Sequence, residues 1–166
     1  MTRRASGECT EASEDEAARK KCLHLLSLRA RSRAELEERL TSAGFAQETI
    51  ERVLADLERA GLVNDEEFAR SWVAGRKAGG GTGRRKLRWE LRRKGIGEEL
   101  VRRVLEDEVD EEAELREAME LARRRLRGRQ VEAKTLAQLR NLLVGRGFGF
   151  DTVDHVLQRV AKGMGH

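Results

Sequence analysis

One sequence pattern occurs three times in this chain of 166 residues, and it constrains the fold more than any other feature. The three copies read LEERLTSAGFAQETIERVL, LRWELRRKGIGEELVRRVL and LRNLLVGRGFGFDTVDHVL. Each copy has two leucines four residues apart, a glycine four residues after the second leucine, and Phe or Ile directly after the glycine. The glycines, Gly44, Gly95 and Gly147, are 51 and 52 residues apart. Such regular spacing predicts a tandem repeat.

Each copy is typical of two short helices joined at a glycine corner. Leucines four residues apart lie on the same face of a helix. Glycine readily adopts the left-handed backbone that ends many helices, and the chain has 16 glycines but no proline to stop its helices. The apolar residue that follows the glycine (Phe45, Ile96 or Phe148) can fold back over the last helical turn. The residues after it repeat their apolar positions with the period of a helix, so a second helix follows each corner.

A further helix precedes each copy. Before the first copy, an apolar run at residues 22–28 ends ahead of Ser32, which with Glu35 fits a capping box that starts the first helix of the copy itself. Asn64 with Glu67 fits a capping box that starts the helix preceding the second copy. Phe68 and Trp72 lie four residues apart, and we expect both in the core. No segment has the alternating pattern of a strand. The sequence therefore predicts an all-α fold.

The predicted architecture is three tandem three-helix repeats, at residues 16–61, 62–110 and 111–163. Because units this small bury little surface alone, we expect neighbouring repeats to pack on one another in an elongated, curved arc. Residues 1–15 are rich in small, polar and acidic residues, which predicts a flexible acidic tail.

Composition disfavours several classes of protein. No window resembles a membrane span and the N-terminus lacks the apolar core of a secretory signal, so we expect a cytoplasmic protein. Cys9 and Cys22 are expected to be free thiols. The sequence contains no CxxC or HxxxH spacing and no carboxylate–histidine cluster, so we expect no metal and no cofactor. The stretch AGGGTGRRK (78–86) lacks the spacing of a phosphate-binding loop and indicates a flexible link. We expect no catalytic residues and no enzymatic activity.

The net charge is only +4, but charge is unevenly distributed. Residues 84–94 hold seven basic residues and one acid, Glu90, and residues 123–129 hold five arginines and no acid. On a helical wheel with Leu87 and Leu91 facing the core, Arg85, Arg92 and Arg93 point outward around Trp89. The candidate binding residues for a partner are Arg84, Arg85, Lys86, Arg88, Trp89, Arg92, Arg93 and Lys94, with Arg123, Arg124 and Arg127 as a second set.

Trp89 has three interpretations from sequence alone. It can anchor a protein interface, stack against a nucleobase, or pack beneath a neighbouring helix. The basic stretch can likewise attract phosphate or an acidic protein groove, or serve only as a solvated surface.

Four stretches resemble the RecX family, regulators of the RecA recombinase: RSRAELEERLTSAGF (31–45), GLVNDEEFARSWV (61–73), GRRKLRWELRRKGI (83–96) and RGFGFDTVDHVL (146–157). The resemblance implies a non-catalytic helical protein that docks in the groove of the RecA–DNA filament and inhibits ATP hydrolysis, strand exchange and co-protease activity. Arg84 stands where the family often has proline, and we expect this to loosen the start of that helix. Trp89 stands where a polar residue is more usual.

Two other functions stay open. One is a DNA-binding protein of the helix-turn-helix type that acts without RecA and reads duplex DNA through the helix of residues 84–94. Acidic residues near the start of the helix after each corner (Glu48, Glu98, Glu99 and Asp151) argue against it. The other is a helical adaptor for a different protein. Besides the RecA filament, single- or double-stranded DNA is a candidate partner for the basic surface, and we expect a monomer.

Overall fold

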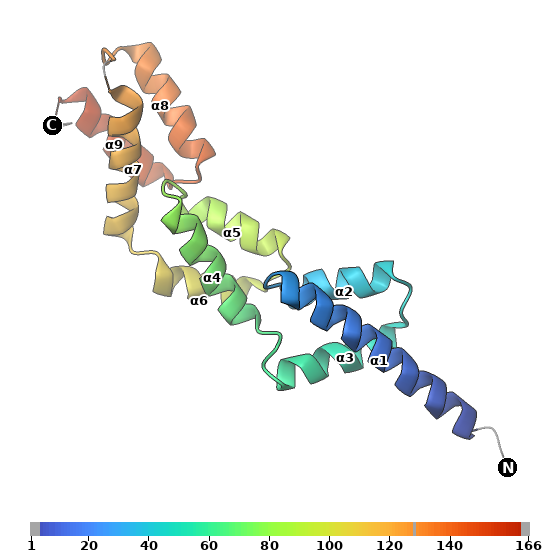
Figure 1. Cartoon of the computed structure of the whole chain (residues 1–166). Coiled ribbons are helices and arrows are strands. Elements are labelled where there is room, and N and C mark those ends of the chain that lie inside the picture. Colours follow the sequence, from blue (N-terminus) through green and yellow to red (C-terminus); the bar gives the residue numbers. More distant parts are fainter. Residues whose placement is uncertain (1–3, 128, 164–166) are drawn as a thin grey trace. The chain divides into compact units, whose positions relative to one another are not determined.

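The computed structural model describes residues 4–127 and 129–163, and all regular structure among them is helical (Figure 1). The helices, in chain order, are α1 (Arg4–Leu28), α2 (Arg33–Ser42), α3 (Gln47–Arg59), α4 (Asp65–Ala78), α5 (Arg84–Arg93), α6 (Glu98–Glu108), α7 (Glu111–Leu126), α8 (Ala133–Gly145) and α9 (Phe150–Ala161). The predicted all-α fold is confirmed. In the described residues no helix combines the length and apolar character that crossing a membrane requires.

Contacts between residues divide the chain into two compact units. Unit 1 comprises Met1–Phe68 together with Lys94–Ile96, and unit 2 comprises Ala69–Arg93 together with Gly97–His166. This division does not follow the three repeats, whose boundaries at 16–61, 62–110 and 111–163 therefore stay a prediction.

In unit 1, α1, α2 and α3 pack against one another around one hydrophobic core. Leu36 and Leu40 of α2 are fully buried in it, as the leucine pattern predicts. The Ser32 hydroxyl accepts a hydrogen bond from the backbone N–H of Glu35 and so caps α2. The Glu35 carboxylate does not complete the predicted capping box, because it binds Arg29 and Lys94 instead.

The segment predicted as a flexible acidic tail, residues 1–15, contains the start of α1. Helix begins at Arg4, so most of that segment is helical, and residues 1–3 lie outside the described residues. Two acidic residues attach it to α3: Asp15 accepts hydrogen bonds from Arg52, and Glu14 accepts one from the backbone N–H of Ala46, the N-cap of α3. A carboxylate is favoured at a helix N-terminus, which accounts for the contact of Glu14 with the start of α3.

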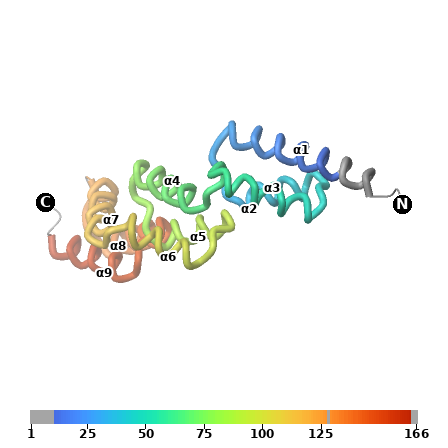
Figure 2. Tube along the Cα trace, turned by 90° about the horizontal axis from the view of Figure 1, so that it is seen from below, coloured from blue at the N-terminus to red at the C-terminus, as the bar shows by residue number. Residues whose placement is uncertain are grey.

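In unit 2, α7, α8 and α9 enclose a second core, and they lie together in both ribbon views (Figures 1 and 2). Helices α5 and α6 also pack together. The corner glycines have the predicted left-handed backbone, with φ of +87° at Gly44, +78° at Gly95 and +85° at Gly147. The Phe148 N–H bonds to the carbonyl of Leu143, and its ring is fully buried. The glycine-corner prediction is therefore confirmed at the backbone level.

Candidate basic interface on α5

Helix α5 turns its apolar side inward and most of its arginines outward. Leu87 and Leu91 are fully buried, as the helical wheel predicts. The exposed residues of α5 are Arg85, Arg88, Trp89, Arg92 and Arg93. Trp89 is 55% exposed, so it does not pack beneath a neighbouring helix.

The only acid of the basic stretch, Glu90, lies on the inner side of α5. It is buried, and its carboxylate accepts hydrogen bonds from the Trp72 indole N–H at 2.9 Å and from two nitrogens of Arg76 at 2.8 Å. Trp72 is only half-buried, whereas Phe68 is buried. The prediction of a core position is therefore confirmed for Phe68. Trp72 lies only partly in the core, and its indole N–H donates to Glu90. Because Glu90 is engaged internally, it does not neutralise the outer surface.

The N-terminus of α5 is held against the corner between α8 and α9. The backbone N–H of Gly83 donates to the carbonyl of Arg146 at 2.9 Å, and that of Arg85 donates to Gly147 at 3.0 Å. The two chains approach so closely that a Cβ added at Gly83 would lie 2.4 Å from the Gly147 backbone. Only glycine allows this contact, and it brings the first residue of α9, Phe150, beside Arg85.

Arg84 belongs to the packing of unit 2 and not to the outer surface. Its backbone N–H donates to the Glu114 carboxylate at 2.8 Å, and its guanidinium donates to the carbonyls of Leu105 and Val109 at 3.0 and 2.9 Å. The expectation that Arg84 loosens the start of the helix is therefore wrong. These bonds anchor α5. Because the Arg84 guanidinium is engaged in them, it is not free on the outer surface for a partner.

Lys94 is also occupied internally. Its ammonium donates to Glu35 at 2.6 Å, its carbonyl accepts from the Ser32 hydroxyl at 2.6 Å, and its side chain is only 25% exposed. Lys86 is half-buried, and its backbone lies against Gly147. Neither residue belongs to the fully exposed face of α5.

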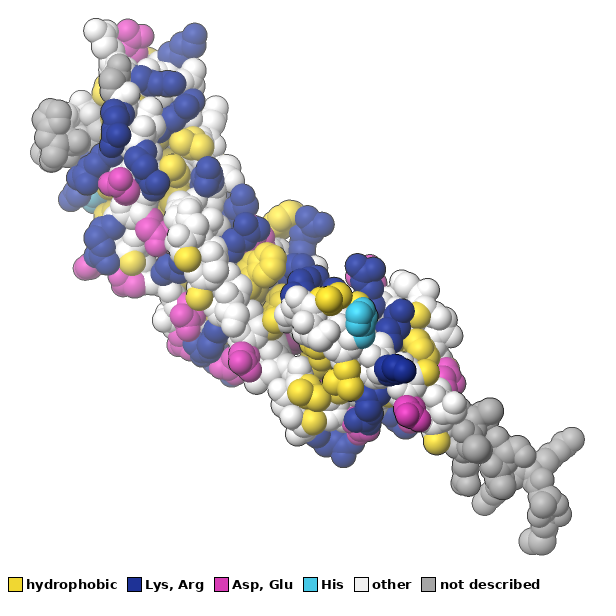
Figure 3. Space-filling view, in the orientation of Figure 1, with side chains coloured by type: hydrophobic (Ala, Val, Ile, Leu, Met, Phe, Trp, Pro, Cys, Tyr) yellow, Lys and Arg dark blue, Asp and Glu magenta, His cyan; other side chains and the backbone are white. Residues whose placement is uncertain are grey.

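Two exposed arginines of α5 each lie over an aromatic ring. The Arg85 guanidinium lies 4.5 Å from the centroid of Phe150, and that of Arg93 lies 4.7 Å from the centroid of Trp89. Phe150 is 58% exposed. Arg85, Trp89 and Arg93 are four residues apart in turn, so they follow one side of the helix. We call Phe150, Arg85, Trp89 and Arg93 the aromatic–arginine stripe. In the space-filling view, hydrophobic and basic side chains lie among one another over α5 (Figure 3).

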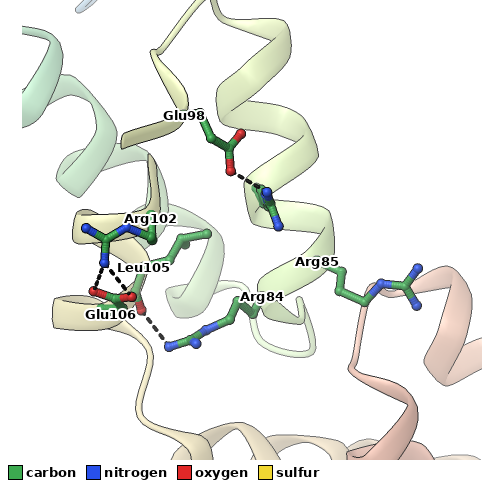
Figure 4. Close-up of a pocket in the computed structure, with 7 residues that line it drawn as sticks. Arg84, Arg85, Glu98, Arg102, Leu105 and Glu106 are labelled. Carbon is green, nitrogen blue, oxygen red and sulfur yellow. Dashed lines mark hydrogen bonds and ion pairs between the residues drawn. The ribbon is translucent and has the colours of Figure 1, made fainter. Parts of the chain in front are cut away.

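Beside α5 lies a cavity of about 210 Å³ that α6 helps to line (Figure 4). Its lining residues are Arg84, Arg85, Arg88, Glu98, Arg102, Leu105 and Glu106. Glu98 binds Arg88 and lies 3.3 Å from Arg92, so the carboxylate of α6 offsets these two arginines. Hydrogen bonds to Glu99 and Glu106 raise the pKa of Arg102. Arg85 and Arg93 have no carboxylate partner among the described residues, so the uncompensated charge lies on the stripe.

The second predicted set lies at the C-terminal end of α7. Arg123, Arg124 and Arg127 are exposed, and Arg124 is 3.7 Å from Glu120 on its own helix. The Arg124 guanidinium also approaches Gly80 in the link between α4 and α5. Among the described residues no group of three or more His, Cys, Asp or Glu side chains is arranged to hold a metal ion.

Phe150 is the residue that sequence reasoning missed. The three copies align Phe150 with Gln47 and Glu98, each three residues after the corner glycine. The other two copies have a polar residue at this position, so the aromatic residue in the third copy is the sequence signal that could have identified Phe150. Its neighbour Phe148 fills the buried place after the corner, which leaves Phe150 outside.

Comparison with known proteins identifies the family. Residues 18–57 match the model of the first three-helix domain of RecX, and residues 64–105 match that of the second. The chain is 39% identical to regulatory protein RecX of Mycolicibacterium smegmatis, over 82% of this chain and 75% of that protein. It is 43% identical to regulatory protein RecX of Amycolatopsis mediterranei, over 79% of this chain and 75% of that protein.

Solved structures show the same fold. The crystal structure of RecX from Lactobacillus salivarius has a TM-score of 0.82 at 21% identity, covering 90% of this chain and 98% of that one. A second crystal structure of a regulatory protein RecX has a TM-score of 0.79 at 25% identity, covering 90% of this chain and 74% of that one. From its two matched domains and its identity to curated relatives over most of its length, the chain belongs to the RecX family.

Proposed function

We propose that this chain is a non-catalytic regulator that binds the RecA–single-stranded-DNA filament in its helical groove and inhibits ATP hydrolysis, strand exchange and co-protease activity. Its membership in a family of regulatory proteins supports the proposal. The observation that carries the binding part is the outer face of α5, where Arg85 and Arg93 have no carboxylate partner among the described residues and Glu90 faces inward. Such a face attracts a polyanionic or acidic assembly, with an affinity that falls as salt rises.

The helix-turn-helix alternative has a specific difficulty. The helices that follow the glycine corners carry acids in their first turns: Glu48 in α3, Glu98 and Glu99 in α6, and Asp151 in α9. A recognition helix enters the major groove with its N-terminal residues, where carboxylates are repelled by phosphates. We therefore favour filament binding over the reading of bare duplex.

The proposal is tested with the ATPase activity of RecA on single-stranded DNA, measured with added protein at two salt concentrations. The wild type should inhibit, and inhibition should weaken at the higher salt. Replacing Arg85, Arg92 and Arg93 together by Glu should abolish inhibition with little change in melting temperature, because all three side chains are exposed.

A matched control variant makes the same change in net charge at three basic residues outside α5. Lys20, Lys21 and Arg39 are exposed and form no ion pair with described residues, so their triple replacement by Glu should leave inhibition nearly unchanged. Replacing Arg123, Arg124 and Arg127 tests the second set separately. Full inhibition by the α5 triple variant would place the contact elsewhere. Tight, sequence-dependent binding to bare duplex, without an effect on RecA, would favour the alternative.

A further inference from the structure

The aromatic–arginine stripe exposes two large aromatic rings that the packing of unit 2 does not use. Trp89 and Phe150 are 55% and 58% exposed, although large aromatic side chains are usually mostly buried. Neither ring is needed to fill a core, because Leu87 and Leu91 fill the inner side of α5 and Phe148 fills the core beside Phe150. Two rings kept outside, each beside a guanidinium, indicate a surface built to contact something else.

The charges around the two rings narrow the chemistry of that partner. Arg85 and Arg93 lie on rings and have no carboxylate partner in the part of the chain that the structure describes. The neighbouring Arg92 is offset by Glu98, and Glu90 is turned inward. The stripe therefore offers positive charge and flat apolar faces together, with no acid among its four members.

A ligand that matches both properties carries anionic groups and unpaired flat rings at short, regular intervals. Single-stranded nucleic acid has this composition, and proteins bind it by combining basic residues with aromatic rings on which bases stack. Duplex DNA hides the faces of its bases, and an acidic protein segment matches only the charges. Along α5, Arg85, Trp89 and Arg93 are spaced about 6 Å apart in turn, at 1.5 Å per residue, so successive groups of one strand can reach them.

We propose that the aromatic–arginine stripe binds single-stranded nucleic acid, with bases stacked on Trp89 and Phe150 and phosphates bound by Arg85 and Arg93. The contact between Gly83 and Arg146 holds α5 against the corner that carries Phe150, so the two rings belong to one rigid site. The inference deepens the proposed function by naming a ligand for the same face. Binding to a free strand is nevertheless measurable without RecA, so the two proposals can fail separately.

The test measures the affinity of the full chain for a labelled oligothymidine and for an abasic oligomer with the same number of phosphates, by fluorescence anisotropy. We expect the wild type to bind oligothymidine at least roughly tenfold more tightly, because stacking on one aromatic side chain contributes affinity of that order and two rings are available. Trp89→Ala and Phe150→Ala should each remove much of this difference while leaving abasic binding nearly unchanged. Trp89→Phe should retain most of it. A double Arg85→Glu and Arg93→Glu variant should weaken binding of both oligomers.

Leu62→Ala is the matched control, because Leu62 is a comparably exposed apolar residue outside the stripe, and it should change neither affinity. Quenching of Trp89 emission by oligothymidine, measured against the Trp89→Phe variant, reports stacking directly. Equal affinities for the two oligomers, or an unchanged preference in both alanine variants, would overturn the proposal. Displacement of oligothymidine by polyglutamate at equal charge concentration would also overturn it, in favour of an acidic protein partner. A Trp89→Ala variant that loses strand binding but still inhibits RecA would separate this site from the filament contact.

Discussion

The backbone N–H of Gly83 donates a hydrogen bond of 2.9 Å to the carbonyl of Arg146. An equivalent contact occurs in unit 1, where the Ser32 hydroxyl donates to the carbonyl of Lys94 at 2.6 Å. Ser32 precedes Gly83 by 51 residues and Lys94 precedes Arg146 by 52, which is the spacing of the repeated pattern. In both cases the start of one helix is bound to the residue before a corner glycine. The repeated sequence thus encodes a repeated packing contact as well as a repeated helix pair.

Replacing Gly83 by Ala should destabilise the protein by about 2 kcal/mol, because the new methyl group would force the start of α5 away from the Gly147 backbone. Gly145→Ala is the matched control, because a Cβ at Gly145 meets no atom within 4 Å and Gly145 ends helix α8. It should be neutral or slightly stabilising. Urea unfolding followed by circular dichroism measures both. Similar midpoints for the two variants would show that the close backbone contact contributes nothing.

Two of the corner glycines allow the cost of a left-handed backbone to be measured separately from the cost of a steric clash. Gly44 and Gly95 both belong to unit 1 and have similar positive φ. A Cβ at Gly44 meets open space, whereas one at Gly95 would lie 2.2 Å from the Cβ of Ala34. We expect Gly44→Ala to cost about 1 kcal/mol for the backbone alone, and Gly95→Ala to cost clearly more. Equal losses in thermal melts of the two variants would refute the clash at Ala34.

Much of the fold follows from the sequence because the signals are local. Leucine spacing, corner glycines and the caps at Ser32 and Asn64 depend on residues within one turn, and the structure has them where they are predicted. The internal partners of Arg84 and Lys94 do not follow from the sequence, because they are distant in the chain. Glu114 lies 30 residues from Arg84 and Glu35 lies 59 residues from Lys94. A charge count along one helix cannot show that distant carboxylates and carbonyls bind two of its basic residues.

Glu35 makes the stability of unit 1 depend on pH. Burial alone would raise its pKa, but hydrogen bonds from Arg29 and Lys94 outweigh burial and lower the pKa to about 2, from an ordinary value of 4.5. Because the folded pKa is depressed, the stabilisation is fully present above pH 4.5 and is lost as the pH falls from 4.5 towards 2. A shift of this size corresponds to at most about 3 kcal/mol, and solvent screening of the partly exposed carboxylate reduces the expected loss of unfolding free energy across this window to about 2 kcal/mol.

Glu35→Gln should remove this pH dependence, and it should destabilise the protein at pH 7 more than at pH 3. Urea unfolding at both values measures the difference. Glu38→Gln, an exposed residue of the same helix, controls for the loss of one negative charge and should keep the wild-type slope. A wild-type slope in Glu35→Gln would show that this carboxylate is not responsible.

Glu90 supports the outer face of α5 from the inside, because its carboxylate is buried and bound within unit 2. Its buried carboxylate accepts from Trp72 and Arg76, so Glu90→Ala should cost about 2–3 kcal/mol, and Glu90→Gln should cost less because an amide oxygen can still accept one hydrogen bond. Glu106→Gln, at an exposed ion pair with Arg102, should cost less than about 0.5 kcal/mol. Because Glu90 faces inward, the folded Glu90→Gln protein should inhibit RecA and bind oligothymidine as the wild type does. Loss of both activities in a variant that melts normally would contradict the inward role that the structure gives this residue.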